Sequence, residues 1–215
     1  MVKVLQELDF IDRSGAPLPK GTMACHLFVP EDALLVADVI IALKGFEKFT
    51  APQAFAICAA FVTEGPYSDR TKISDKVVRV GLQICRRVAR KLASKLHFHQ
   101  LPCCKTCGLN ASGCDGEAMI KARLNPQLCE TAFQWASGQD FTAAVLSSRV
   151  ATGGEGVVTR TLRRLDELMR EVTFVLRHDL ASPEAAQVIQ NLAGDLRLCS
   201  MFKFVFLVVI PAQIY

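Results

Sequence analysis

The sequence predicts an all-α fold: a helical bundle with one long helix and one cysteine-rich inserted loop. Hydrophobic residues make up 51% of the 215-residue chain and charged residues 21%, so a sizeable core can be buried. Along most of the chain, apolar residues recur at steps of three and four, which is the spacing of an amphipathic helix. The sequence shows no run of alternating strands and helices, which argues against a βαβ nucleotide-binding fold.

Turn residues and helix-start signals set the expected elements. Proline suits the first helical turn because its φ angle is fixed and its missing N–H is not needed there. At Pro52 and Pro183 it follows a Thr or Ser, which can cap a free backbone N–H. Helices are expected at residues 1–8, 32–44, 52–62, 72–96, 116–136, 141–149, 155–177 and 183–201. A short extended pair is expected around Ile11 and residues 18–23.

These elements group into two parts. Residues 1–30 should form an N-terminal helix and a turn-rich link, and residues 31–215 should form the helical bundle. The stretch 98–117 is rich in Cys, Gly and polar residues and breaks the helical period. We therefore expect a loop there, inserted between two long helices.

Net charge, cysteine content and hydrophobic runs bear on the type of ligand and on the cellular compartment of the protein. The formal net charge of +4 is too small to indicate nucleic-acid binding by itself. Nine cysteines are present, and the N-terminus lacks a basic start followed by a long apolar run. We therefore expect a reducing compartment, either nucleus or cytoplasm. The apolar run 204–210 is far shorter than the roughly 18 residues of a membrane span, so no membrane contact is expected.

The helix expected at residues 155–177 is amphipathic and carries several arginines on one side. Its core-facing seam is expected to be Val158, Leu162, Leu165, Met169, Val172 and Leu176. Its opposite side carries Arg160, Arg164, Glu167 and Glu171, with Arg163 and Arg170 on the flank. These charges could be a solvated face whose ion pairs contribute about 0.2–0.5 kcal/mol each. They could instead line a channel for a polyanion, since the planar fork of arginine binds phosphate and lies flat on bases.

A second basic segment, residues 76–95, contains no acidic residue. Its cations are Lys76, Arg79, Arg86, Arg87, Arg90, Lys91 and Lys95, and its expected buried stripe is Val77, Val80, Ile84, Val88, Leu92 and Leu96. Such a helix would repel itself unless acidic neighbours from other helices, or a nucleic acid, lay nearby. Charge patterning leaves both explanations open.

The stretch 155–172, EGVVTRTLRRLDELMREV, resembles a signature of the superkiller-type DExH-box RNA helicases, which include the nuclear exosome helicase and the cytoplasmic antiviral helicase. It is similar to the E-G-S-hydrophobic-hydrophobic-R-x-hydrophobic-R-R-L-x-E-L pattern of their C-terminal DSHCT domain. The matching residues are Glu155, Gly156, Arg160, Arg163, Arg164, Leu165, Glu167 and Leu168. Further similar motifs, in family order, are W-x-x-G-x-x-F at 135–141, A-R-R-I-A at 86–89, D-E-L-L-L-T-E-L at 32–40 and K-G-R-V-A-C at 20–25.

The resemblance implies a helical bundle packed against a helicase motor domain. Its long helix would act as a ratchet along the exit path of single-stranded RNA during RNA processing and decay with exosome-associated proteins. By position, Arg164 and Glu167 would face the RNA, with Arg160 one turn earlier. The full set of expected RNA-binding residues is Arg160, Arg163, Arg164, Glu167, Arg86, Arg87 and Arg90. We expect the nucleus as compartment, with the cytoplasm as the alternative.

The sequence also departs from the family pattern. Thr22, Ala33 and Val157 replace an arginine, a glutamate and a serine of the motifs, and the end after Asp195 differs. ATP and Mg²⁺ belong to the parent helicases, but this chain has neither a G-x-x-x-x-G-K-[ST] loop nor a DExH box, so it should not hydrolyse ATP alone. Two alternatives stay open: a helix-turn-helix-like duplex DNA binder built from 141–149 and the arginine helix, or a purely structural protein-interaction scaffold.

The cysteine-rich insert offers a possible zinc site. Cys104 and Cys107 form a C-x-x-C half-site, and Cys103, Cys114, His97 or His99 could complete a tetrahedron. The favoured set is Cys103, Cys104, Cys107 and His99. The alternative is an unstructured insert with reduced thiols, and the resemblance implies no metal here.

Overall fold

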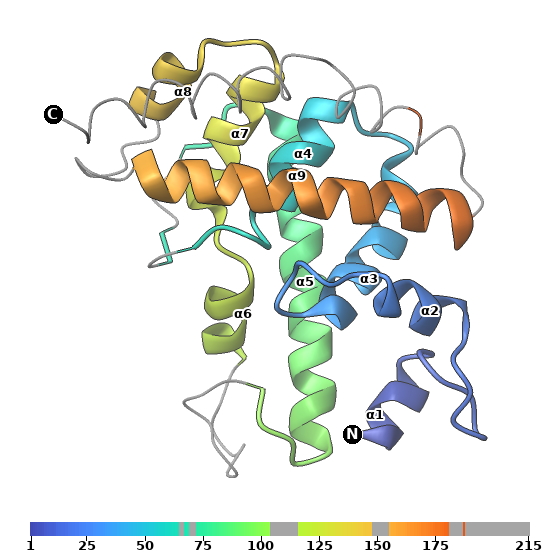
Figure 1. The fold of residues 1–215 in the computed structure, drawn as a ribbon. Helices are drawn as coiled ribbons and strands as arrows, with labels where there is room; N and C mark the ends of the chain where they lie inside the picture. The colour runs from blue at the N-terminus through green and yellow to red at the C-terminus, as the bar shows by residue number, and fades with distance from the viewer. Residues whose placement is uncertain (65–66, 69–71, 104–115, 148–154, 181–186, 188–215) are drawn as a thin grey trace, which may run out of the picture.

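The computed structural model describes residues 1–64, 67–68, 72–103, 116–147, 155–180 and 187. These residues form helices, and within them the only β-type pairing is an isolated bridge between Ile11 and Pro17. The helices are α1 (Val2–Glu7), α2 (Pro19–Cys25), α3 (Ala33–Ala42), η1 (Lys44–Phe46), α4 (Ala51–Ala59), α5 (Lys76–Phe98), α6 (Glu117–Arg123), η2 (Pro126–Leu128), α7 (Cys129–Ala136), α8 (Phe141–Ser147) and α9 (Glu155–His178) (Figure 1). The predicted all-α fold is confirmed.

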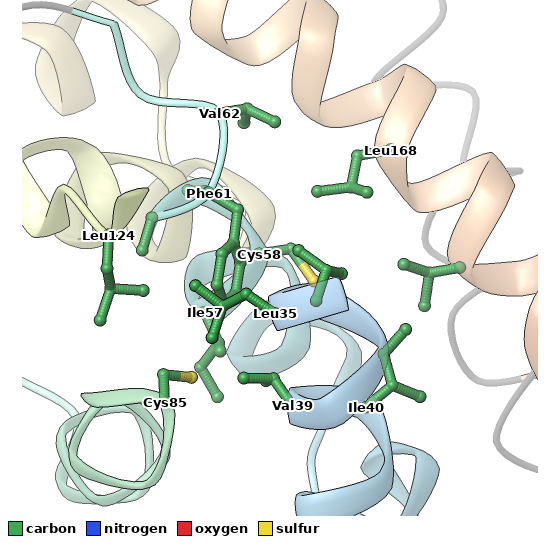
Figure 2. Close-up of a cluster of buried hydrophobic side chains, with 14 of the residues drawn as sticks. Leu35, Val39, Ile40, Ile57, Cys58, Phe61, Val62, Cys85, Leu124 and Leu168 are labelled. Atoms are coloured by element: carbon green, nitrogen blue, oxygen red, sulfur yellow. The ribbon is translucent and has the colours of Figure 1, made fainter. Parts of the chain in front are cut away.

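Helix α4 lies at the centre of the bundle. Its residues from Ala54 to Ala59 are all buried, as expected for a helix that is apolar on every side. It packs against α5, α7 and α9. Figure 2 shows its Ile57 and Cys58 among apolar side chains from neighbouring helices, including Leu35 of α3, Cys85 of α5 and Leu168 of α9. This core therefore fixes α9 relative to the rest of the bundle.

Aspartate side chains cap the starts of helices α3 and α5. The Asp32 carboxylate accepts from the N–H of Leu35 at 3.0 Å at the start of α3. Asp75 accepts from the N–H of Val78 at 2.8 Å at the start of α5. Each bond satisfies a donor that the first helical turn leaves without a partner.

Two expected elements differ from the structure. The helix expected at 116–136 is interrupted, because α6 ends at Arg123 and Asn125 starts the 3-10 turn η2 with Pro126 at its first position. Proline has no N–H to continue a helical ladder. The extended stretch expected at 18–23 is instead helix α2, which begins at Pro19. The helix expected at 183–201 lies outside the described residues.

The buried stripe expected for α5 was right only toward its end, where Leu92 and Leu96 are buried, while Ile84 and Val88 are half-buried. Val77 and Val80 are 39% and 45% exposed. The buried residues are Val78, Gly81, Leu82, Cys85, Ala89, Leu92, Ala93 and Leu96. Both sets fit a helical period, because valines stand at 77, 78 and 80. The packing partner decides the face: the Cα of Gly81 turns toward Ile57 of α4, where a Cβ would lie 2.4 Å from the Ile57 Cδ1 atom.

Three cysteines lie deepest among the buried cysteines of the described residues. Cys58, Cys85 and Cys129 are at most 2% exposed. Burial raises the pKa of the Cys58 thiol to about 12, and it raises the pKa values of Cys85 and Cys129 as well. Because the thiolate is the reactive form, these residues act as small apolar side chains. Among the described helices, none is long and apolar enough to cross a bilayer.

Glycine at position 21 is required by a close backbone contact. A Cβ there would lie 2.0 Å from the carbonyl oxygen of Phe10, which accepts a hydrogen bond from the Leu18 N–H. We expect Gly21→Ala to lower the free energy of unfolding by about 1–3 kcal/mol, since backbone must move. The control is Gly156→Ala, in an exposed part of α9 with nothing within 4 Å, which should raise it by about 0.5–1 kcal/mol. Urea denaturation of both variants measures this, and equal stabilities would contradict the packing.

Candidate nucleic-acid interface

The inner side of α9 is fully buried. All six residues of the predicted seam, Val158, Leu162, Leu165, Met169, Val172 and Leu176, are at most 3% exposed. Thr161, Leu168 and Val175 are also buried and widen the seam. This prediction is confirmed, and a rigid helix buried along one side must present the other side outward.

The outer side of α9 forms what we call the arginine ridge, which consists of Arg160, Arg163, Arg164, Glu167, Arg170 and Glu171. The side chains of Arg160, Arg163 and Arg170 are 66–69% exposed. Arg163 Nε lies 4.0 Å from Glu167 Oε1, and Arg170 pairs with Asp166 at 2.7 Å. Exposed pairs of this i,i+4 kind contribute only about 0.3–0.5 kcal/mol, so a ligand can replace them at small cost.

Arg164 is more firmly held than its neighbours. Its Nη1 donates to Glu64 Oε1 at 2.9 Å, and its Nη2 donates to the backbone carbonyl of Val29 at 3.0 Å. Arg160 Nε lies 3.7 Å from the second oxygen of Glu64. One carboxylate therefore bridges two ridge arginines in a position that a phosphate could also occupy.

Glu171 holds the segment between α2 and α3 against the ridge. Its Oε2 accepts from the N–H groups of Phe28 and Val29, at 3.0 and 3.1 Å. Partial burial raises the pKa of Glu171, although these two hydrogen bonds act in the opposite direction. Since Arg164 binds the Val29 carbonyl, two ridge residues hold the peptide groups on both sides of Val29. We call residues 26–30 the ridge loop.

A small polar cavity of about 190 Å³ lies beside Arg164. Glu64 and Asp32 line it together with Arg123, which comes from α6 and pairs with Glu31 at 2.8 Å. The ridge thus continues inward into a recess with a second arginine.

Two of the three expected RNA-binding residues of α5, Arg86 and Arg90, have partners away from the ridge. Arg86 Nη2 donates to the Tyr67 hydroxyl at 2.5 Å, and Arg90 donates two hydrogen bonds to Glu117, at 3.0 and 2.9 Å. In the described part of the chain, Arg87 has no ion-pair partner, and none of the three arginines shares a hydrogen bond or ion pair with the ridge. Lys95 pairs with Glu7. Acidic neighbours therefore explain Arg90 and Lys95.

Comparison with known proteins adds independent evidence. Residues 14–193 match the DSHCT (NUC185) domain, which is most of the chain.

The chain belongs to the DSHCT domain family.

The ridge loop and the whole of α9 lie inside the matched region. This DSHCT domain is 28% identical over 199 residues to mRNA transport homolog 4 of Caenorhabditis elegans, covering 91% of this chain and 17% of that protein. It is 26% identical over 174 residues to the human exosome RNA helicase MTR4, covering 79% of this chain and 15% of that protein. It is 26% identical over 170 residues to the antiviral helicase SKI2 of Saccharomyces cerevisiae, covering 79% of this chain and 12% of that protein. The chain thus spans less than a fifth of the length of these relatives.

The predicted zinc ligands of this DSHCT domain are only partly described. Cys104, Cys107 and Cys114 lie outside the described residues. His99 Nε2 lies 2.8 Å from Glu7 Oε1, whereas His97 Nε2 lies 2.9 Å from the Sγ atom of the buried Cys103. Within the described residues, no group of three His, Cys, Asp or Glu side chains could hold a metal ion. Zinc at Cys103, Cys104, Cys107 and His99 stays a prediction.

The acceptor role of Glu171 can be separated from its charge. We expect Glu171→Ala to speed hydrogen exchange of the Phe28 and Val29 amides about tenfold, because both N–H groups lose their acceptor. The matched variant Glu171→Gln keeps an acceptor oxygen and should leave most of the protection. Amide-resolved exchange monitored by NMR measures both rates, and protection unaffected by Glu171→Ala would show that the ridge loop is held in another way.

Proposed function

We propose that this DSHCT domain binds single-stranded RNA along the arginine ridge, as the C-terminal part of an exosome-type RNA helicase. The supporting observation is that Arg160, Arg163 and Arg164 stand on one outward side of a helix whose inner side is buried. The names of two relatives, an mRNA transport homolog and an exosome RNA helicase, support RNA as the ligand. The partners we propose are the helicase motor domain and exosome-associated proteins, in the nucleus, with the cytoplasm as the alternative.

The ridge suits binding that depends little on base sequence. Arginine forks grip phosphates, and this part of the affinity is the same for every base. Glu167 is 53% exposed and can accept a hydrogen bond from a ribose hydroxyl or a base. In this proposal α9 acts as a ratchet helix, over which the strand passes as it leaves the motor domain.

RNA would exchange one ion pair for another at the firmly held end of the ridge. A phosphate that reaches Arg160 and Arg164 takes the place of the Glu64 carboxylate. Arg164 stays oriented during this exchange, because its Nη2 remains bonded to the Val29 carbonyl. Glu64 therefore keeps two arginines in place while it competes with the ligand.

Removing a ridge arginine tests the phosphate contact. We expect Arg160→Ala to weaken binding of an unstructured 12-nucleotide RNA about three- to tenfold and to reduce the salt slope by about 0.7, the value of one contact on a single strand. Arg13→Ala removes the same charge from an exposed position outside the ridge and should change neither quantity. Fluorescence anisotropy at several salt concentrations measures both. An unchanged slope in Arg160→Ala, or stronger binding of duplex DNA of equal length, would refute the proposal.

Removing the competing carboxylate should act in the opposite direction. Glu64→Gln keeps the shape of the side chain but removes its charge, so both arginines are released to the phosphate. We expect RNA to bind about two- to fivefold more tightly, as for a modest exposed ion pair. The same anisotropy titration gives the result. Weaker binding by Glu64→Gln would mean that Glu64 holds the arginines for the ligand and does not compete with it.

A further inference from the structure

Beyond Glu171 the outer side of α9 becomes aromatic. Phe174 and His178 continue the line of Arg160, Arg164, Glu167 and Glu171, again at steps of three and four. Phe174 is 44% exposed, and its ring centroid lies 4.3 Å from that of His178 with 33° between the planes. His26 of the ridge loop contacts the same Phe174 ring edge-on at 4.9 Å, and its Nδ1 lies 2.9 Å from Asp179 Oδ2. The phenylalanine ring is thus held from two sides while part of it faces outward.

The ridge loop presents a second aromatic side chain. Phe28 is 81% exposed, more than any other large apolar residue described in the structure. Within the described residues its ring contacts no other ring, yet its backbone N–H is bonded to Glu171. The backbone is therefore fixed while the ring stays in solvent. The fold gains little from a phenylalanine in this position, since an apolar side chain stabilises a fold only by being removed from water.

We propose that Phe28 and Phe174 form a stacking site for the bases of a single-stranded nucleic acid that lies along the arginine ridge. This inference rests on the proposed function and extends it from phosphate to base contacts. Both residues adjoin Glu171: the backbone N–H of Phe28 in the ridge loop is bonded to its carboxylate, and Phe174 follows it by three positions along α9. Proteins that bind single strands without sequence preference combine a cationic track with aromatic rings on which bases stack.

The distance between the arginines and Phe174 along α9 favours an oligonucleotide ligand over a single nucleotide. Arg164 and Phe174 are separated by ten positions, which corresponds to about 15 Å of helix at 1.5 Å per residue. A ligand that touches both must therefore be extended. It must also carry negative charge at the Arg160 end and flat apolar surface at the Phe174 end. An oligonucleotide has both properties at once, because phosphates and bases alternate on the same chain.

Base contacts can be separated from phosphate contacts with an abasic oligomer. We expect the double variant Phe28→Ala/Phe174→Ala to bind a 12-nucleotide oligouridine at least about tenfold more weakly, since two bases lose their stacking partners. Its affinity for a 12-unit abasic strand with the same phosphates should stay the same, as should the salt slope. Phe98→Ala removes a ring that is 76% exposed at the end of α5 and should affect neither ligand. Phe28→Trp should keep the affinity, and its fluorescence should be quenched by oligouridine only.

The outcomes distinguish this inference from the proposed function. If Arg160→Ala weakens binding of both oligomers but the double phenylalanine variant weakens neither, RNA binds along the ridge without this stacking site and the inference is overturned. Equal losses for oligouridine and the abasic strand would also overturn it, because the rings would then act on folding or on the backbone. If the wild-type chain binds no single strand at all, both the proposed function and this inference fail. The remaining explanation would then be that the rings bind a protein partner.

Discussion

The burial of one side of α9 is the interaction on which the rest of the structure depends. Its seam residues are almost completely removed from solvent, and each large aliphatic side chain contributes up to about 1.5–3 kcal/mol to folding. Rotation of α9 about its axis would expose the seam and force arginines into the interior, where an unpaired charge costs several kcal/mol. The direction of the ridge therefore follows from the packing of α9 on α4 and needs no contribution from a ligand.

Arg164 shows that stability and binding overlap at this surface. Its side chain is 32% exposed, about half as much as that of Arg160, and it bonds both Glu64 and the Val29 carbonyl. Its loss would loosen the ridge loop as well as remove a phosphate contact, so a weakened variant could be explained in either way. Arg160 has only the longer contact to Glu64, which makes it the clearer probe of RNA binding. The family resemblance alone, which placed Arg160, Arg164 and Glu167 together on the side facing the RNA, does not make this distinction.

The sequence predicted the parts of the fold that one dominant period determines. The buried seam of α9 could be predicted from the sequence, because its large apolar residues recur at steps of three and four and charged residues occupy the opposite side. The seam of α5 could not, since adjacent valines at 77 and 78 fit two stripes and only contact with α4 selects one. The roles of Glu64 and Phe28 could not be predicted from the sequence either. Arg164 lies 100 positions from Glu64, and Glu171 lies 143 positions from Phe28, so no local spacing marks these contacts. The only sequence signal for Phe28 is a large apolar residue in a turn beside Pro30.

Photo-crosslinking of a 4-thiouridine-substituted single-stranded RNA to the wild-type chain, followed by mass-spectrometric mapping, tests the central claim most directly. The account predicts that crosslinked peptides come from α9 between Arg160 and His178 and from the ridge loop around Phe28. They should disappear when unlabelled RNA is added in excess. Crosslinks confined to α5, or spread evenly over the surface, would show that the outer side of α9 does not bind RNA.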